Sequence, residues 1–382
     1  MFDYHNDFDS DSDSDFDSDS EFNSCYGKKF EDSYDVSSPT SDEDYNVYST
    51  ETVIGKINEI MTILQTDPHN DGKIEKLYDI FCKIVIIDEH HKAIDFLLFG
   101  KIYEKTIDPA YMNNYAIKQA SKYGCIKNVK LLLKHTGIDV SACDGVHVAN
   151  AVSNGHTEIV KLFLQNGNIF DLFDRYYQKK ILLIACKKNY HDIVELLIND
   201  DRIFINDYYW ELLDIVSING SIEIVKLFLL SEKSFVDPLN DSATVLSIAA
   251  KFGHLKIIKF LLTEYEIKEK DYGELSDGEL SDDELNCKII NGKLHPSIDK
   301  NDAIIVASKH NKVKIVKYLL EHPAIKTTNF IDIIHRALKH ENYDIVKLFV
   351  LKIDPNQVTL SKFGLQISGN FLNIVKDIRK NK

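Results

Sequence analysis

The sequence of 382 residues contains no long apolar run and few cysteines. No stretch approaches the roughly 20 apolar residues that a helix needs to span a bilayer. The N-terminal segment is acidic, whereas a secretory signal would be basic and then apolar. The six cysteines are scattered without a CxxC pair, which favours reduced thiols over a disulfide framework or a zinc knuckle. We therefore expect a soluble intracellular protein, cytoplasmic or nuclear, with no membrane segment.

Clustered positive charge is also missing. The formal net charge is −15, but residues 1–50 hold 15 acidic residues and two lysines, which leaves only −2 for the rest of the chain. Binding to phosphates needs clustered Lys and Arg, so we expect no specific nucleic-acid partner. Residues 1–50 include DFDSDSDSDFDSDSEF, in which Asp alternates with Ser or Phe. Such dense like charge with little to bury predicts a disordered acidic tail. This tail either binds basic partners or serves only to solubilise the protein.

Motifs for catalysis, cofactors and metals are absent from the sequence. There is no GxSxG, and no Gly-Lys pair is followed by the Ser or Thr of a phosphate-binding loop. His340-Glu341 lacks the second His of a zinc protease, because Asp344 stands in its place. Residues 67–78 resemble a calcium loop only superficially, because Tyr78 occupies the position of the bidentate Glu. The sequence therefore predicts no enzyme, no cofactor and no metal site.

What the sequence does contain is a repeated helical hairpin, clearest in residues 243–262. Its first half places Leu246, Ala249 and Ala250 on one stripe of a short helix, and its second half forms another apolar stripe. Gly253 lies between the halves, as suits the left-handed residue that ends a helix. The pattern predicts two short helices that approach closely through small side chains.

Copies of this hairpin recur along the chain. Positions equivalent to Ile257 are Ile94, Asn128, Ile159, Ile193, Ile224, Ile315, Ile345 and Ile374, at intervals of 34, 31, 34, 31, 33, 58, 30 and 29 residues. Asn189 takes the place of Gly253 in one copy, and Asn tolerates the left-handed conformation next best. A single hairpin buries too little surface to be stable, so successive copies must stack into a solenoid.

The residues of the repeat resemble the ankyrin family. TVLSIAAKFGH, which begins at Thr244, is similar to the ankyrin helix-start pattern, and GHTEIVKLFL at Gly155 and GSIEIVKLFL at Gly220 resemble its second helix. The resemblance covers roughly residues 76–382. Because its repeats are degenerate, the chain resembles in particular the ankyrin-repeat proteins of large DNA viruses. No copy has Pro in the opening turn, so we expect irregular finger loops. The fold class expected is all-α, an ankyrin-like α-solenoid with short finger loops.

The resemblance implies that partner proteins bind the concave face formed by the finger loops and the first helices. Trp and Tyr are frequent interface hot spots, so the aromatic and acidic residues nearest the fingers are the predicted contacts. These are Asp144, Asp174, Tyr176, Tyr177, Tyr208, Tyr209 and Trp210. Packing between fingers explains the aromatic residues equally well. The predicted function is a monomeric, non-enzymatic scaffold for protein–protein interaction.

The predicted organisation has three parts. Residues 1–50 are the acidic tail, 51–109 a helical N-terminal cap with a degenerate repeat, and 110–382 the ankyrin array with an acidic insertion at about 265–299. Ser276 and Ser281 each precede a Glu by three residues within this insertion, a pattern that resembles acidophilic kinase sites. An unmodified acidic loop explains the insertion equally well.

Two further functions remain open at this point. Residues 51–109 could form an adaptor domain that delivers bound proteins to a ubiquitin ligase, although no motif beyond helicity supports it. The tail could instead act as a charge mimic that occupies basic proteins such as histones. Binding that vanishes on deletion of the tail and weakens steeply with salt would distinguish the charge mimic from recognition by the repeats.

Overall fold

The structure is a computed structural model of the chain. It describes residues 47–67, 70–100, 107–135, 138, 145–166, 175–205, 208–230, 238–266, 289–290, 293–294, 303–322, 333–334, 337 and 340–352. These residues fall into two compact units, the first ending at Ile107 and the second beginning at Asp108. Over the described ranges, no helix has both the length and the apolar character needed to cross a bilayer.

The first unit is a small group of helices that share one apolar core. It contains α3 (Thr50–Thr66), α4 (Asp71–Ile84), the 3₁₀ turn η3 (Asp88–His90) and α5 (His91–Phe99). Ser49 caps α3 by accepting a hydrogen bond from the Thr52 backbone N–H at 3.3 Å, which satisfies one of the free donors of the first turn. Leu77, Ile80, Phe81 and Ile84 are buried on one face of α4.

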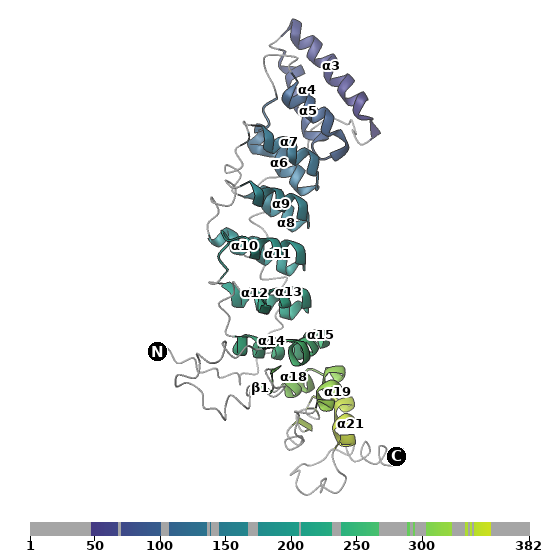
Figure 1. The fold of residues 1–382 in the computed structure, drawn as a ribbon. Coiled ribbons are helices and arrows are strands. Elements are labelled where there is room, and N and C mark those ends of the chain that lie inside the picture. The colour runs from purple at the N-terminus through teal and green to yellow at the C-terminus, as the bar shows by residue number, and fades with distance from the viewer. Residues whose placement is uncertain are drawn as a thin grey trace. The chain divides into compact units, whose positions relative to one another are not determined.

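The second unit is a series of helical hairpins, which confirms the predicted all-α repeat architecture (Figure 1). The first helices of successive copies are α6 (Tyr111–Lys122), α8 (Val146–Ser153), α10 (Arg175–Lys187), α12 (Tyr209–Asn219), α14 (Pro238–Phe252) and α18 (Ala303–Lys309). The second helices are α7 (Ile126–Lys134), α9 (Thr157–Gln165), α11 (His191–Asn199), α13 (Ile222–Leu230), α15 (Leu255–Lys259), α19 (Val313–Glu321) and α21 (Tyr343–Lys352).

Each hairpin packs against the next copy along the chain. First helices contact first helices from α6 through α8, α10, α12 and α14 to α18, and second helices follow the same order from α7 to α15. The first helices approach one another closely because one equivalent position in each carries a small buried side chain. This residue is Ala in every described copy except one, where it is Val216. The others are Ala120, Ala151, Ala185, Ala249, Ala307 and Ala337, each 0% exposed. The core is therefore continuous along the array, as expected of a solenoid.

A residue with left-handed backbone separates the two helices in each described copy of the array. The glycines at this position have φ between +73° and +100°, and three copies use another residue there. The positions are Gly124, Gly155, Asn189, Gly220, Gly253, Asn311 and Glu341. This confirms the sequence prediction for Gly253 and Asn189, whose backbone ends the first helix in the left-handed region.

In several copies the residue after the left-handed position packs back onto the preceding copy. The imidazole of His254 bonds through Nε2 to the Ile218 carbonyl oxygen at 2.6 Å, and His156 bonds in the same way to Lys122 at 2.9 Å. Asn342 donates its side-chain amide to the Ser308 carbonyl oxygen at 2.9 Å. The bonds to Lys122 and Ile218 use carbonyl groups in the last turn of a first helix, which the helix itself leaves without a partner. The Ser308 carbonyl oxygen also accepts from the Asn311 N–H at 3.4 Å. The hairpins are thereby joined by polar contacts as well as by the core.

The fifth copy departs from the regular hairpin at the end of its second helix. There α15 passes into a π-helical turn, η6 (Phe260–Glu264), closed by the Tyr265 N–H donating to the Phe260 carbonyl oxygen at 2.8 Å. The insertion that follows contains a short antiparallel pair, β1 (Ile289–Ile290) with β2 (Lys293–Leu294), which the sequence did not predict. Strand β2 contacts η6 and α14. The acidic part of the insertion, like residues 1–46 of the acidic tail, lies outside the described residues.

Candidate functional site: the finger loop between α11 and α12

Tyr177 joins two successive copies through its hydroxyl group. This hydroxyl donates to the Gly145 carbonyl oxygen and accepts from the Ala149 N–H at 3.2 Å, at the start of α8. A Cβ atom on Gly145 would lie 2.3 Å from the Tyr177 ring, so the glycine is needed both for its φ of +72° and for this contact. Burial raises the pKa of the Tyr177 hydroxyl. The structure thus places this predicted contact residue between repeats.

Tyr208 and Tyr209 are also interior residues, with 5% and 4% of their surface exposed. The Tyr209 hydroxyl donates to the Phe228 carbonyl oxygen at 3.4 Å, and its ring meets the Phe228 ring edge-on at 5.5 Å between centroids. Burial, together with the nearby Asp241 carboxylate, raises the pKa of the Tyr209 hydroxyl. These two tyrosines stabilise the start of α12 in the folded array.

Tyr176 and Trp210 are the predicted aromatic residues that remain at the surface, 58% and 48% exposed. Phe204, in the loop between them, is 54% exposed and was not among the predicted contacts. Tyr176 lies at the start of α10 and Trp210 at the start of α12, helices that pack directly on one another. We call Tyr176, Phe204 and Trp210 the aromatic patch. These residues lie on α10, on α12 and on the loop that precedes α12, and exposed large apolar side chains on neighbouring elements are typical of an interaction site.

The loop that carries Phe204 is held in place by a buried amide. Gln178 is only 4% exposed; its Nε2 donates to the Arg202 carbonyl oxygen at 3.0 Å and its Oε1 accepts from the Phe204 N–H at 3.1 Å. Both polar ends of the side chain are therefore used to fix the two loop residues on either side of Ile203. Gln178 belongs to α10, so the finger is tied to the copy that precedes α12.

Arg202 provides the second anchor of the finger loop. Its Nη2 donates to the Leu164 carbonyl oxygen of the preceding copy at 2.7 Å and pairs with the Asp200 carboxylate at 2.7 Å. Its Nε contacts the other Asp200 oxygen at 2.9 Å, which makes the pair bidentate. A planar guanidinium fixed at both ends restricts the loop more than a single ammonium contact would. These contacts hold residues 200–205 of the loop in place without any partner.

Charged side chains surround the aromatic patch. The Arg175 guanidinium lies 5.4 Å from the centre of the Phe204 ring, within the range of a cation–π contact. Lys179 of α10 pairs with Glu211 of α12 at 2.5 Å. Aromatic residues beside arginine, with a charged rim, match the usual composition of a protein interface.

The remaining predicted positions fall outside the part of the chain that the structure describes. They are the contact residues Asp144 and Asp174 and the phosphorylation candidates Ser276 and Ser281. Their roles stay predictions.

The buried thiols of the described residues are unsuited to nucleophilic chemistry. Cys82, Cys125 and Cys186 are buried and form no disulfide with one another. Burial raises the pKa of Cys82 and of Cys186 to about 12, so both remain protonated thiols near neutral pH. A protonated thiol is a poor nucleophile and a poor metal ligand.

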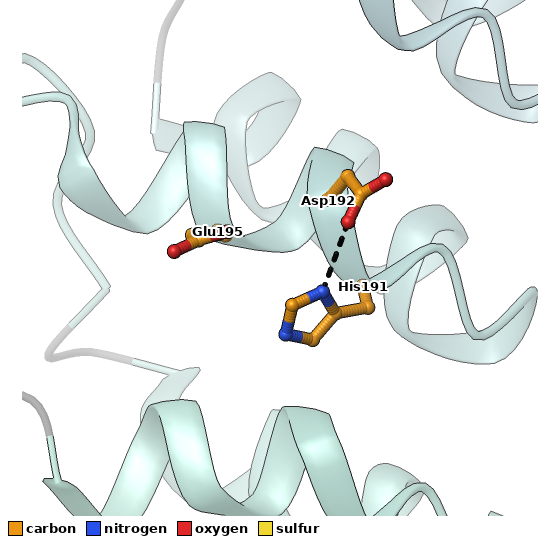
Figure 2. Close-up of side chains that lie close together, drawn as sticks. All are labelled: His191, Asp192 and Glu195. Carbon is orange, nitrogen blue, oxygen red and sulfur yellow. Dashed lines mark hydrogen bonds and ion pairs between the residues drawn. The ribbon is translucent and has the colours of Figure 1, made fainter.

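Within the part of the chain that the structure describes, one group of side chains has ligand atoms close enough to suggest a metal site. His191, Asp192 and Glu195 lie at the start of α11 with these atoms within 4.8 Å of one another (Figure 2). His191 Nδ1 is already hydrogen-bonded to the Asp192 carboxylate at 3.0 Å. The positive end of the α11 dipole opposes a bound cation, and both carboxylates are exposed to water. We assign these residues to ordinary surface pairing.

The geometry defines a class of protein: an α-helical repeat array with an ordered, aromatic finger loop. Comparison with protein families gives the class its name. Residues 146–209 match ankyrin repeats described as three copies, and residues 117–164 match ankyrin repeats described as many copies. These segments include α8 to the start of α12 and thus the finger loop. Residues 117–209 therefore match ankyrin repeats, a family of protein–protein interaction modules that are generally non-catalytic scaffolds.

A viral protein is similar to this chain over a longer segment. An ankyrin repeat protein of Acanthamoeba polyphaga mimivirus is 24% identical over 226 residues, which is 59% of this chain and 33% of the relative. The matched segment therefore spans about a third of that relative's length. The predicted resemblance to the ankyrin-repeat proteins of large DNA viruses is confirmed.

Removing the Gln178 amide should loosen the finger loop. In Gln178→Ala the Arg202 carbonyl and the Phe204 N–H lose their partner, at a cost of about 1 kcal/mol because water can reach a surface loop. Hydrogen exchange measured by mass spectrometry should show faster exchange over residues 202–205. Gln165→Ala, at an exposed position of α9, is the control and should leave this exchange unchanged. Equal exchange in both variants would show that Gln178 does not hold the loop.

Proposed function

We propose that this protein is a non-enzymatic scaffold that binds a partner protein through the aromatic patch and the adjoining finger loop. The observation that carries the proposal is the exposure of Tyr176, Phe204 and Trp210 around a loop held by Gln178 and Arg202. A loop ordered in advance loses little conformational entropy on binding. Association should therefore need little change in the backbone.

The composition of the patch supports a protein partner. Trp and Tyr bury large areas with few rotatable bonds, and Arg175 offers a planar cation that can pair with a carboxylate at the rim. The pair formed by Lys179 and Glu211 supplies polar groups of both signs beside the apolar centre. An apolar centre with a mixed polar rim suits an ordinary protein surface.

Trp210→Ala should weaken partner binding about tenfold, because truncation of a central aromatic anchor costs more than 1 kcal/mol. The measurement is quantitative affinity purification from the host cell, comparing wild type with Trp210→Ala and with the combined Tyr176→Ala, Phe204→Ala and Trp210→Ala variant. Partners that depend on the patch should decrease in the first variant and disappear in the second.

A matched control uses exposed aromatic residues at the opposite end of the first helices from the finger loops. Tyr123 and Phe252 are 55% and 42% exposed, and each directly precedes a left-handed glycine at the turn between the two helices of its hairpin. Replacing both with alanine removes similar apolar surface and should leave partner recovery unchanged. Loss of the same partners in this control, or their full recovery with the combined patch variant, would contradict the proposal.

A further inference from the structure

Positively charged side chains gather on the array at the turns between first and second helices, where the fifth, sixth and seventh copies meet. Lys251 and Lys309 occupy the same position in successive copies, near the ends of α14 and α18. These two helices contact one another, so their equivalent positions are separated by about one helix spacing of 8–10 Å. The stacking of repeats thus places these two lysines beside each other.

Three further residues complete the group. His310 and His340 occupy equivalent positions in the sixth and seventh copies, each next to a left-handed residue. Lys312 extends over Gly253 of the fifth copy, where a Cβ atom would lie 3.3 Å from the Lys312 Cδ. We call Lys251, Lys309, His310, Lys312 and His340 the cation cluster.

The members of the cation cluster affect one another electrostatically. Burial, followed by the charges of Lys251, Lys309, Lys312 and His340, lowers the pKa of His310. Positive charges held close together disfavour the charged form of each group, and a nearby anion offsets this effect. Over the described ranges, no carboxylate forms an ion pair with any member of the cluster. The cluster is therefore suited to an acidic ligand.

The sequence supplies such a ligand between the same two copies. Residues 271–285 hold seven acidic residues and no basic residue. This stretch is joined to the described structure at Glu266 on one side and to β1 on the other, and β2 contacts α14, the helix that ends beside Lys251. A ligand attached at both ends reaches an effective concentration in the millimolar range.

We propose that the cation cluster binds the acidic segment 271–285 of the same chain. Ala303 begins α18 and Lys309 ends it, so the end of the insertion is about 10 Å from the cluster at 1.5 Å per helical residue. Extended chain covers roughly 3.3 Å per residue, and the segment reaches the cluster within its length. Phosphate on Ser276 or Ser281 adds about −1.5 to −2 charges and strengthens the contact. The aromatic patch, on other copies, is not involved.

Carbodiimide cross-linking of the full-length protein tests this directly, because it joins only carboxylates and amines in contact. Peptide mapping should find amide links from acidic residues of 271–285 to Lys251, Lys309 or Lys312. Lys127, Lys130 and Lys134 of α7 are three exposed lysines that serve as internal controls and should not be linked to this segment. Links spread equally over α7, or no links to the cluster, would overturn the proposal.

The titration of His310, followed by nuclear magnetic resonance, gives an independent test. Neutralising the segment should lower the pKa of His310 by roughly half a unit, since the segment's negative charges favour the imidazolium. The variant combines Asp277→Asn, Glu279→Gln, Asp282→Asn, Asp283→Asn and Glu284→Gln. Its matched control combines Asp11→Asn, Asp13→Asn, Asp15→Asn, Asp17→Asn and Asp19→Asn, which removes the same charge from the N-terminal tail. An unchanged His310 pKa, or an equal shift in both variants, would overturn the proposal.

Discussion

Gly220→Ala is expected to lower the free energy of unfolding by about 3 kcal/mol. Gly220 has φ of +73°, and an L-residue pays roughly 1–2 kcal/mol in that region. The added Cβ would also lie 2.3 Å from the His254 imidazole. The ring must move, and its hydrogen bond to the Ile218 carbonyl is lost, at about 1 kcal/mol. Urea unfolding followed by circular dichroism measures the change.

Gly55→Ala is the control for this substitution. Gly55 lies within α3, has no positive φ, and a Cβ there would meet nothing within 4 Å. Alanine should therefore stabilise α3 by about 1 kcal/mol through its higher helix propensity. If both glycine variants changed stability in the same direction, the backbone argument for Gly220 would be wrong.

The chain itself indicates how the loss at Gly220 could be reduced. Where the left-handed residue is Gly, a long side chain of the next copy lies over it. The pairs are Gly124 with His156, Gly155 with Tyr190, Gly220 with His254, and Gly253 with Lys312. Where the left-handed residue is Asn189 or Asn311, the next copy has the smaller Ser221 or Asn342 at that position. Adding His254→Ser to Gly220→Asn copies the second arrangement. It should recover part of the stability that Gly220→Asn alone loses.

This pairing also shows how far sequence reasoning can reach. The left-handed conformation at Gly253 and Asn189 is predictable because it depends on the residue itself and on its place between two apolar stripes. Glu341 has the same backbone conformation, with φ of 58°, and nothing in its own chemistry indicates it. There the packed copies on either side determine the turn, which a single position in the sequence does not reveal.

The finger loop was harder to predict for a related reason. Its two anchors join residues far apart in sequence, Gln178 to Arg202 and Arg202 to Leu164. No spacing rule links a polar residue in a first helix to a carbonyl 24 residues later. Of the predicted aromatic residues, Tyr176 and Trp210 are exposed, whereas Tyr177, Tyr208 and Tyr209 pack between elements or hold them together. Gln178 stands between tyrosines and lysines in the sequence, so its own neighbours gave no signal that it is buried.

The second large effect concerns pH and a buried histidine. His147 is 0% exposed in α8, its ring meets Phe163 edge-on at 4.8 Å, and neither ring nitrogen has a hydrogen-bond partner among the described residues. The equivalent positions of the other described copies are apolar: Ala116, Ile181, Leu212, Val245, Ala303 and Ile333. Burial, reinforced by the charge of Lys118, lowers the pKa of His147 to about 3. The folded array therefore holds this imidazole in its neutral form.

Acidification should consequently destabilise the protein through His147. Because the folded pKa is lowered, the unfolded chain takes up a proton near pH 6.5 while the folded chain resists it down to about pH 3. The contribution is fully present above pH 6.5 and is lost progressively as the pH falls toward 3. At pH 5 the loss amounts to about 2 kcal/mol relative to pH 8. Urea unfolding at both pH values measures it.

His147→Leu isolates this contribution from every other titrating group. Leucine removes the proton uptake and places in α8 the residue type that Leu212 provides in α12, at a buried site where an apolar side chain needs no partner. Between pH 8 and pH 5 the variant should lose about 2 kcal/mol less stability than wild type. Carboxylates and exposed histidines titrate alike in both proteins and cancel in the comparison. If the two proteins lost stability in parallel, His147 would have to be solvated or hydrogen-bonded in solution, which contradicts its burial beside Phe163.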